Sequence, residues 1–334
     1  MAPTEPTTTV PTSSTTTTAS TTTTVPPCSA GAVSTIAVDG PGPVVAAFSN
    51  IWVGTANSTV VRVEPGSSIP AAPITTGGGF SGFPVVDLAS DATNVLAVTR
   101  SNYFDAIDPA TDLTTGRLVP GFNPNAVVSD GTNLWVAVSS LSAASPPFGP
   151  TGQSAVLKTS VGSGGALGVL ATVPVPGVAV DVVAANGSIW VATFSSVERI
   201  DPTTGAVIAS IPASAKVLAS DGSSIWAGGG SGLVSKIDPS TNSVVASVRV
   251  GPAGFGPQAM AVVGSRLWTA PAAFVDPTTG GPSTSTGLVA VDRASTSVER
   301  TISLPAQVGG PAWDGSYLWS SMTSRNEVTK VETC

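Results

Sequence analysis

Short apolar runs alternate with polar turns along most of the chain, and this pattern predicts β-strands rather than helices. Seven runs share one form, a turn of the Asp-Gly type followed by a strand with Trp or Leu at its centre, as in "TNLWVA" and "GSIWVA". Apolar segments of this length, bounded by Gly, Asn, Asp and Ser, are typical of β-strands. The central residues form a column of Trp52, Leu96, Trp135, Trp190, Trp226, Trp268 and Trp319.

A second motif follows the column residue after eleven or twelve positions in four of these units, with turns at Glu64, Asp108, Asp201 and Asp238. An acidic residue before Pro, with Gly or Asn shortly after, favours a tight turn, because Pro presets φ and an Asp side chain accepts bonds from nearby backbone N–H groups. Another β-rich run follows each turn. Each unit therefore reads as four antiparallel strands in about 40 to 50 residues, the size of a β-propeller blade.

The repeat predicts an all-β fold, a seven-bladed β-propeller. The intervals between column residues are 44, 39, 55, 36, 42 and 51. The two longest contain the insertions "SSLSAASPPFGPTGQS" and "PAAFVDPTTGGPSTSTG", which we place between the second and third strands of their units. We expect the column residues to pack between adjacent sheets rather than to stack on a ligand, because wedge-shaped gaps between blades need bulky apolar layers.

The last unit lacks an outer strand, and the beginning of the domain can supply it. "AGAVSTIAV" aligns with "TGAVIASIP" of the fourth unit, which sets Cys28 on Pro202, while Cys334 falls on Thr203. We therefore expect an N-terminal outer strand to close the propeller and a Cys28–Cys334 disulfide to join the seam. Two unpaired cysteines are the alternative.

Composition separates the first 27 residues from the rest of the chain. Residues 1–27 contain thirteen Thr, five Pro and three Ser, which predicts a disordered stalk or linker ahead of a propeller over residues 28–334. No export signal is present in this sequence. The stalk composition and the expected disulfide nevertheless predict a secreted or cell-surface protein, and no apolar stretch is long enough for direct membrane insertion.

Charge argues against nucleic acid as a partner. The net charge is -7, and the thirteen Lys and Arg residues are scattered along the chain. Proteins that bind phosphate backbones carry clustered basic residues instead. We expect a monomer that binds an unknown extracellular ligand, which is a glycan, a peptide or a small molecule.

The recurring "ERIDPTTGAVIASIP", followed by "SDGSSIWAGG", resembles the YVTN-type and streptogramin-B-lyase-like propellers, which are quinoprotein-like in shape. The resemblance covers essentially residues 28–334 and implies seven blades. It does not imply one function, since such propellers serve as enzymes, adhesion modules and sensor domains. The lyases use a His base and a divalent metal, and the quinoprotein enzymes often have adjacent cysteines. This chain has no His and no adjacent cysteines.

The absence of His excludes Ser-His and Cys-His nucleophilic catalysis and His-ligated zinc, and we expect no cofactor. Carboxylates remain available. Asp87 and Asp181 stand nine residues before their column residues, on strands that face the central channel, where together they could hold a cation. The alternative, which we favour, is that each accepts hydrogen bonds from neighbouring backbone N–H groups.

The topology of a blade divides the loops between two rims. Inter-blade loops and loops between second and third strands form one rim, which we call the loop rim; the Asp-Gly and Asp-Pro turns form the turn rim, where the stalk leaves. Both insertions and many aromatic residues fall on the loop rim, which predicts a recognition surface there. Its expected residues are Phe80, Phe83, Arg100, Tyr103, Phe122, Phe148, Phe255, Phe274 and Arg325.

These features predict an extracytoplasmic, non-enzymatic recognition module on a Thr-rich stalk, with its ligand on the loop rim. Aromatic side chains that fold inward to fill their own loops are the alternative for the rim residues. For the whole protein, the alternatives are a metal-assisted lyase or hydrolase that uses carboxylates, and the sensor domain of a membrane receptor.

Overall fold

The structure, a computed structural model, describes residues 32–119, 123–139, 154–161, 167–271 and 286–333. These residues form seven antiparallel sheets of four strands each. Blade 1 contains β2 (Pro41–Ala47), β3 (Asn50–Thr55), β4 (Thr59–Val63) and β5 (Ile74–Thr75). Blade 2 contains β6 (Val85–Ser90), β7 (Val95–Thr99), β8 (Tyr103–Ile107) and β9 (Thr114–Leu118). Blade 3 contains β10 (Asn123–Ser129), β11 (Leu134–Ser139), β12 (Ser154–Val161) and β13 (Leu167–Val175).

The remaining four blades repeat this order. Blade 4 contains β14 (Asp181–Ala185), β15 (Ser188–Ala192), β16 (Val197–Ile200) and β17 (Val207–Ile211). Blade 5 contains β18 (Val217–Ser220), β19 (Ile225–Gly228), β20 (Leu233–Asp238) and β21 (Ser243–Arg249). Blade 6 contains β22 (Pro257–Val263), β23 (Arg266–Pro271), β24 (Thr286–Asp292) and β25 (Ser297–Leu304). Blade 7 contains β26 (Gly309–Trp313), β27 (Leu318–Met322), β28 (Glu327–Val331) and β1 (Ala32–Ala37).

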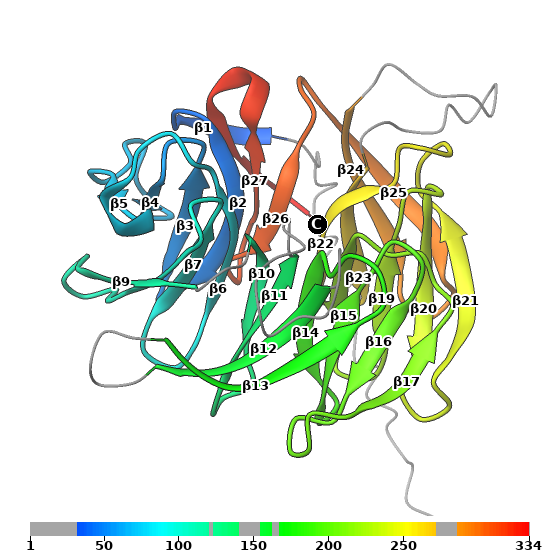
Figure 1. The fold of residues 1–334 in the computed structure, drawn as a ribbon. Coiled ribbons are helices and arrows are strands. Elements are labelled where there is room, and N and C mark those ends of the chain that lie inside the picture. The colour runs from blue at the N-terminus through cyan, green and yellow to red at the C-terminus, as the bar shows by residue number, and fades with distance from the viewer. Residues whose placement is uncertain (1–31, 120–122, 140–153, 162–166, 272–285, 334) are drawn as a thin grey trace, which may run out of the picture.

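The predicted seven-bladed propeller and its N-terminal closing strand are therefore confirmed. Strand β1 pairs with β28, with Ile36 opposite Val328, and forms the outer edge of blade 7. In Figure 1 this strand is blue and lies beside the red C-terminal segment. Helical structure in the described residues is limited to the 3-10 turns η1 (Gly77–Gly79) and η2 (Thr323–Arg325). None of the described helices is long and apolar enough to span a membrane.

The hydrophobic core is divided into seven clusters, one at each junction between adjacent blades. Every column residue is fully buried and belongs to the cluster between its own blade and the next one. The cluster between blades 7 and 1 contains Ile36, Ile51 and Trp319, so the closing strand contributes to a junction like the others. The prediction that the column packs between sheets is confirmed.

A repeated polar contact joins neighbouring blades near the turn rim, and we call it the blade clamp. An Arg or Lys of the third strand lies over the column Trp of its own blade, 4.9 to 5.8 Å from the ring centroid. The same side chain donates to a backbone carbonyl in the turn between the third and fourth strands of the next blade. The five pairs are Arg62 to Pro109, Lys158 to Pro202, Arg199 to Pro239, Lys236 to Arg293 and Lys330 to Pro65.

Two blades lack the clamp because they lack its cation. Blades 2 and 6 have Ala106 and Ala290 at the position of the cation. The acceptor does not require an acidic-Pro turn, since the Arg293 carbonyl of blade 6 accepts from Lys236. The residue on the third strand opposite the column residue therefore decides which blades have a clamp.

Candidate functional site

A cavity of about 500 Å³ lies between the innermost strands of the blades. Blades 2 to 6 each contribute one polar side chain to its wall, and Ser321 and Thr323 add hydroxyl groups from blade 7. The five contributions are Asp87, Asn125, Asp181, Lys216 and Gln258. All five lie within the first three residues of an innermost strand or directly before it, so they gather at the end of the channel that opens on the loop rim. We call this cavity the channel mouth.

Asp87 and Asp181 each join two blades. The Asp87 carboxylate Oδ2 accepts a hydrogen bond from the Val127 N–H of blade 3 at 2.8 Å. The Asp181 carboxylate Oδ2 accepts one from the Leu218 N–H of blade 5 at 2.6 Å, and its Oδ1 lies 2.8 Å from the backbone nitrogen of Val182. The expectation that these carboxylates accept bonds from backbone N–H groups is confirmed.

Both carboxyl groups hold their protons more tightly than a carboxyl group in water. Burial raises the pKa of Asp181 to about 7, against the lowering effect of the N–H groups of Leu218 and Val182. Burial also raises the pKa of Asp87 well above its usual value, and the nearby charge of Asp181 raises it further. Desolvation is the main cause, because a charged carboxylate is less stable where little water reaches it. Ionisable groups of this kind in a cleft are candidates for function.

The described residues do not supply the ligands of a metal centre at these carboxylates. No group of three His, Cys, Asp or Glu side chains in the described part of the chain comes close enough to hold a metal ion. Divalent cations that bind carboxylates take six or more oxygen ligands, some of which are water. The suggestion that Asp87 and Asp181 together bind a cation therefore stays a prediction.

Sequence reasoning did not identify Asn125, Lys216 and Gln258. Each stands ten residues before the column Trp of its blade, so a residue-by-residue alignment of the repeats would have shown three polar residues at one position. The Asn125 amide donates to the Ala179 carbonyl at 2.7 Å and accepts a bond from the predicted site residue Arg100 at 3.3 Å. Lys216 is exposed, and its ammonium group makes no hydrogen bond or ion pair with the described residues.

The loop between blades 1 and 2 brings two predicted site residues together. Phe80 and Tyr103 have ring centroids 5.9 Å apart, at an interplanar angle of 52°. The loop can lie this close because Gly78 has a φ of +67°, and a Cβ there would come within 2.3 Å of the Tyr103 ring. Phe80 is 55% exposed and Phe83 is 41% exposed, so neither ring fills its own loop. In this loop, the alternative of inward-folded aromatics is not observed.

A buried carboxylate anchors this loop. Asp105 of β8 is nearly inaccessible to solvent and accepts a hydrogen bond from the Gly77 N–H at 2.8 Å. Burial raises the pKa of Asp105 to about 6, and the bond from Gly77 lowers it. The Ser58 hydroxyl holds the far end of the loop, because it bonds both the carbonyl and the N–H group of Phe83. The two aromatic side chains are therefore displayed on a loop fixed at both ends.

The other described site residues are spread around the loop rim. Phe255 is exposed in the loop between blades 5 and 6, where Gly254 has a φ of +89°. Arg325 lies in η2 of blade 7 and forms an ion pair with Glu327 at 3.0 Å. Arg100 reaches from the blade 2 loop to Asn125, so it is the predicted cation that borders the channel mouth. The rim residues thus form separate groups rather than one patch.

Several predicted residues lie outside the described part of the chain. They are Phe122, Phe148 and Phe274 of the predicted recognition surface, and Cys28 and Cys334 of the predicted disulfide. The two insertions do follow β11 and β23 and precede β12 and β24, so they connect second and third strands as the sequence predicts.

Comparison with known proteins supports the fold and goes no further. No family model matches the chain, and no curated protein sequence matches it. Among solved structures, it is similar to the β-propeller domain of Cps50 (Swd1) from Myceliophteria thermophila, with a TM-score of 0.68. The two are 11% identical, and the match covers 91% of this chain and 100% of that domain. At this identity the likeness shows a β-propeller and carries no functional assignment.

Proposed function

We propose that this protein is an extracytoplasmic, non-enzymatic recognition module that binds a small polar ligand at the channel mouth. The observation that carries the proposal is the convergence of one polar side chain from each of blades 2 to 6 on one cavity of about 500 Å³. A cavity of this size, with a few convergent polar groups on a rigid scaffold, is the usual form of a small-molecule site.

The side chains of the channel mouth favour a ligand with an acidic group. Of the four lysines, Lys158, Lys236 and Lys330 serve blade clamps, whereas Lys216 has an ammonium group with no partner among the described residues. Near neutral pH the raised pKa of Asp181 leaves this carboxyl substantially protonated, which reduces repulsion of an anion. The aromatic residues Phe80, Phe83 and Tyr103 extend the loop rim outside this polar centre.

The raised pKa values also favour a second candidate, an enzyme that uses its channel carboxyls. A carboxyl group with a pKa near 7 is suited to general acid catalysis at neutral pH. Such an enzyme would be a lyase or hydrolase that uses these channel carboxyl groups together with a divalent metal. Dependence of ligand binding on added metal separates this candidate from the non-enzymatic one.

We also propose that the propeller is of the YVTN and streptogramin-B-lyase-like type. It is exported, is carried on the Thr-rich segment as a stalk, and is closed by a Cys28–Cys334 disulfide. The pairing of Ala32 with Val331 supports the disulfide, because the chain leads from these two opposed residues to the two cysteines within four residues. Thiol titration in denaturant tests it: protein recovered from an oxidising compartment should have no free thiol, and two free thiols would contradict the pairing.

The test of the main proposal is a ligand-observed NMR screen of sugars, sugar acids, amino acids and small organic acids, with and without Ca²⁺, Mg²⁺ and Mn²⁺. We expect an acidic compound to bind without metal. Lys216→Ala should weaken its binding at least about tenfold, because the substitution removes one charge-assisted hydrogen bond. Arg249→Ala, which removes a positive charge outside the channel mouth together with its bonds to the Ser231 and Gly251 carbonyls, is the control and should leave binding unchanged.

Binding that requires a divalent metal would favour the enzyme. The absence of any bound compound, or equal losses in Lys216→Ala and Arg249→Ala, would contradict a site at the channel mouth.

A further inference from the structure

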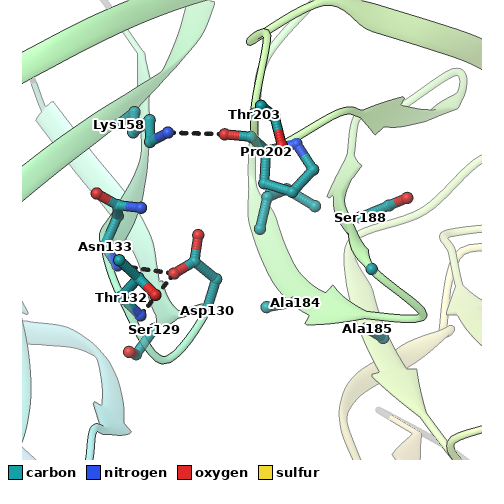
Figure 2. Close-up of a pocket in the computed structure, with 12 residues that line it drawn as sticks. Ser129, Asp130, Thr132, Asn133, Lys158, Ala184, Ala185, Ser188, Pro202 and Thr203 are labelled. Carbon is teal, nitrogen blue, oxygen red and sulfur yellow. Dashed lines mark hydrogen bonds between the residues drawn. The ribbon is translucent and has the colours of Figure 1, made fainter.

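At two junctions a cavity lies beside the blade clamp on the turn rim, the side of the molecule opposite the channel mouth. One cavity of about 550 Å³ lies between blades 3 and 4, and one of about 580 Å³ lies between blades 7 and 1. Figure 2 shows the first, in which the Lys158 ammonium donates to the Pro202 carbonyl across the gap and Asp130 accepts from the N–H groups of Thr132 and Asn133. We call the second the seam cavity.

The two cavities are built from equivalent positions of the repeat. Lys330 and Pro65 of the seam cavity correspond to Lys158 and Pro202, since each lysine donates to the carbonyl of its proline. Asp314 likewise corresponds to Asp130, because each accepts from two backbone N–H groups of its turn and from the indole N–H of its column Trp. The first cavity is therefore an internal reference for the seam cavity.

Aromatic residues replace polar ones in the seam cavity. Tyr317 stands where the reference cavity has Asn133, and Trp313 stands where it has Ser129. Phe48 also lines the seam cavity, whereas its counterpart Asn186 turns to the next blade and donates to the Gly222 carbonyl.

The backbone at Phe48 has an unfavourable conformation. Phe48 and Ser49 have φ values of +51° and +58°, in a turn where blade 4 has Asn186 and Gly187. Two-residue turns with positive φ at both positions favour Asn-Gly, and a bulky residue there is strained. Strained residues of this kind concentrate at binding and catalytic sites. The seam cavity thus keeps an exposed aromatic residue at a position where Asn would be more stable.

The Lys330 ammonium lies over the Tyr317 ring, and polar groups line the cavity beside it. The Lys330 Nζ lies 3.7 Å from the centroid of this ring and 5.7 Å from that of Trp319, and donates to the Pro65 carbonyl at 3.3 Å. Asn50 donates its amide N–H to the Phe48 carbonyl, which leaves its side-chain oxygen without a partner among the described residues. Asp314 and Ser316 complete the polar side of the cavity.

We propose that the seam cavity binds a hexopyranose unit of a carbohydrate chain. A pyranose ring has an apolar C–H face that packs against aromatic rings and a perimeter of hydroxyl groups that both donate and accept hydrogen bonds. The aromatic residues Tyr317 and Phe48 match the first property, and Asn50, Asp314 and Ser316 match the second. The site lies on the turn rim and does not depend on the ligand proposed for the channel mouth.

The experiment titrates the whole protein with four hexasaccharides: those of β-1,4-glucose, α-1,4-glucose, β-1,4-mannose and β-1,4-N-acetylglucosamine. Isothermal calorimetry should show binding of at least one. Tyr317→Asn and Phe48→Asn, which introduce the residues of the reference positions, should each weaken that binding more than tenfold. Asn133→Ala, in the reference cavity, should change it less than twofold.

A stability measurement separates a binding role from a structural one. Phe48→Asn should raise the melting temperature, because Asn accepts a positive φ more readily than Phe, while the affinity falls. A variant that is more stable and binds less cannot be explained by unfolding. Failure of all four hexasaccharides to bind, or unchanged affinity in Phe48→Asn and Tyr317→Asn, would overturn the proposal. Loss of binding in Lys216→Ala instead would place the sugar at the channel mouth and overturn it as well.

Discussion

At the scale of single residues, the channel carboxyls show how position sets the charge of a side chain. Asp181 and the turn residue Asp201 are both acceptors of backbone hydrogen bonds, yet their pKa values move in opposite directions. Burial raises the pKa of Asp181 to about 7, whereas the N–H groups of Thr203 and Thr204 lower the pKa of Asp201 in its surface turn. Desolvation therefore outweighs hydrogen bonding in the channel and is nearly absent in the turn.

The raised pKa of Asp181 predicts that stability falls as the pH rises. The folded state holds this proton up to about pH 7 and the unfolded chain releases it near its ordinary value of 3.8, so the folded state binds more protons between these values. The stabilisation from this bound proton is fully present below about pH 4 and decreases between about pH 4 and pH 7. Above about pH 7 it is lost, and the stability no longer changes because of this group. Because the Asp181 residue is half-buried rather than fully buried, we expect the effect on the free energy of unfolding to be roughly 2 kcal/mol.

Denaturant unfolding at several pH values from about 4 to about 8 measures this effect. Between these pH values the free energy of unfolding of Asp181→Asn should fall by roughly 2 kcal/mol less than that of the unchanged protein, since Asn cannot ionise. Asp201→Asn is the matched control and should shift the whole curve without changing its slope, because its pKa lies below the range. Parallel curves for the unchanged protein and Asp181→Asn would show that burial does not hold the proton.

At the scale of elements, the blade clamp explains how neighbouring sheets keep their angle. The apolar clusters hold adjacent blades together but are not directional, whereas each clamp joins a side chain of one sheet to a backbone carbonyl of the next. The cation also lies over a Trp ring, so its stem covers the edge of the core. Clamp and cluster thus act at the same junction, one at the turn rim and one in the interior.

Replacement of a clamp lysine should destabilise the propeller. Lys158→Met keeps most of the apolar stem and removes the bond to the Pro202 carbonyl and the contact with Trp135, for an expected loss of about 1 to 2 kcal/mol. Lys216→Met removes the same charge from a side chain with no partner among the described residues and should change stability by less than about 0.5 kcal/mol. Denaturant midpoints of the two variants test the difference. Equal midpoints would mean that the clamp contributes nothing to stability.

At the scale of the whole molecule, closure turns a row of blades into a ring. Strand β1 covers the free edge of β28, and Ile36 joins the cluster between blades 7 and 1. An open edge would expose unpaired N–H and C=O groups and invite association with other chains. The outer strand therefore acts on the fold as a whole, although it contributes directly to one blade.

Two truncations test this role. Removal of residues 1–37 deletes β1, exposes the edge of β28 and should abolish cooperative folding or cause aggregation. Removal of residues 1–26 leaves the strand intact and should move the melting temperature by less than about 1 °C, because the Thr-rich segment has no apolar stripe to dock. A milder variant, Ile36→Ala, should cost about 2 to 3 kcal/mol by leaving a cavity. An aggregation-free, fully stable protein without residues 1–37 would contradict the need for closure.

The sequence by itself determined the number of blades, the column of buried Trp and Leu residues and the source of the closing strand. These features are periodic, and a period survives in the sequence because every blade must fill the same wedge. The same reasoning placed Asp87 and Asp181 on the channel, since their distance from the column residue is constant. It also placed the aromatic residues Phe80 and Tyr103 on one rim, through the alternation of strand directions.

Only the tertiary structure decided which residues act together. The channel mouth gathers Asp87, Lys216 and Gln258 from three blades, and the pKa of each carboxyl depends on burial that no local segment specifies. The seam cavity likewise combines Phe48 with Tyr317, which are 269 positions apart in the sequence and meet because the ring closes. Periodic packing is encoded locally, whereas a site is formed by side chains that differ between repeats and meet only in the closed ring.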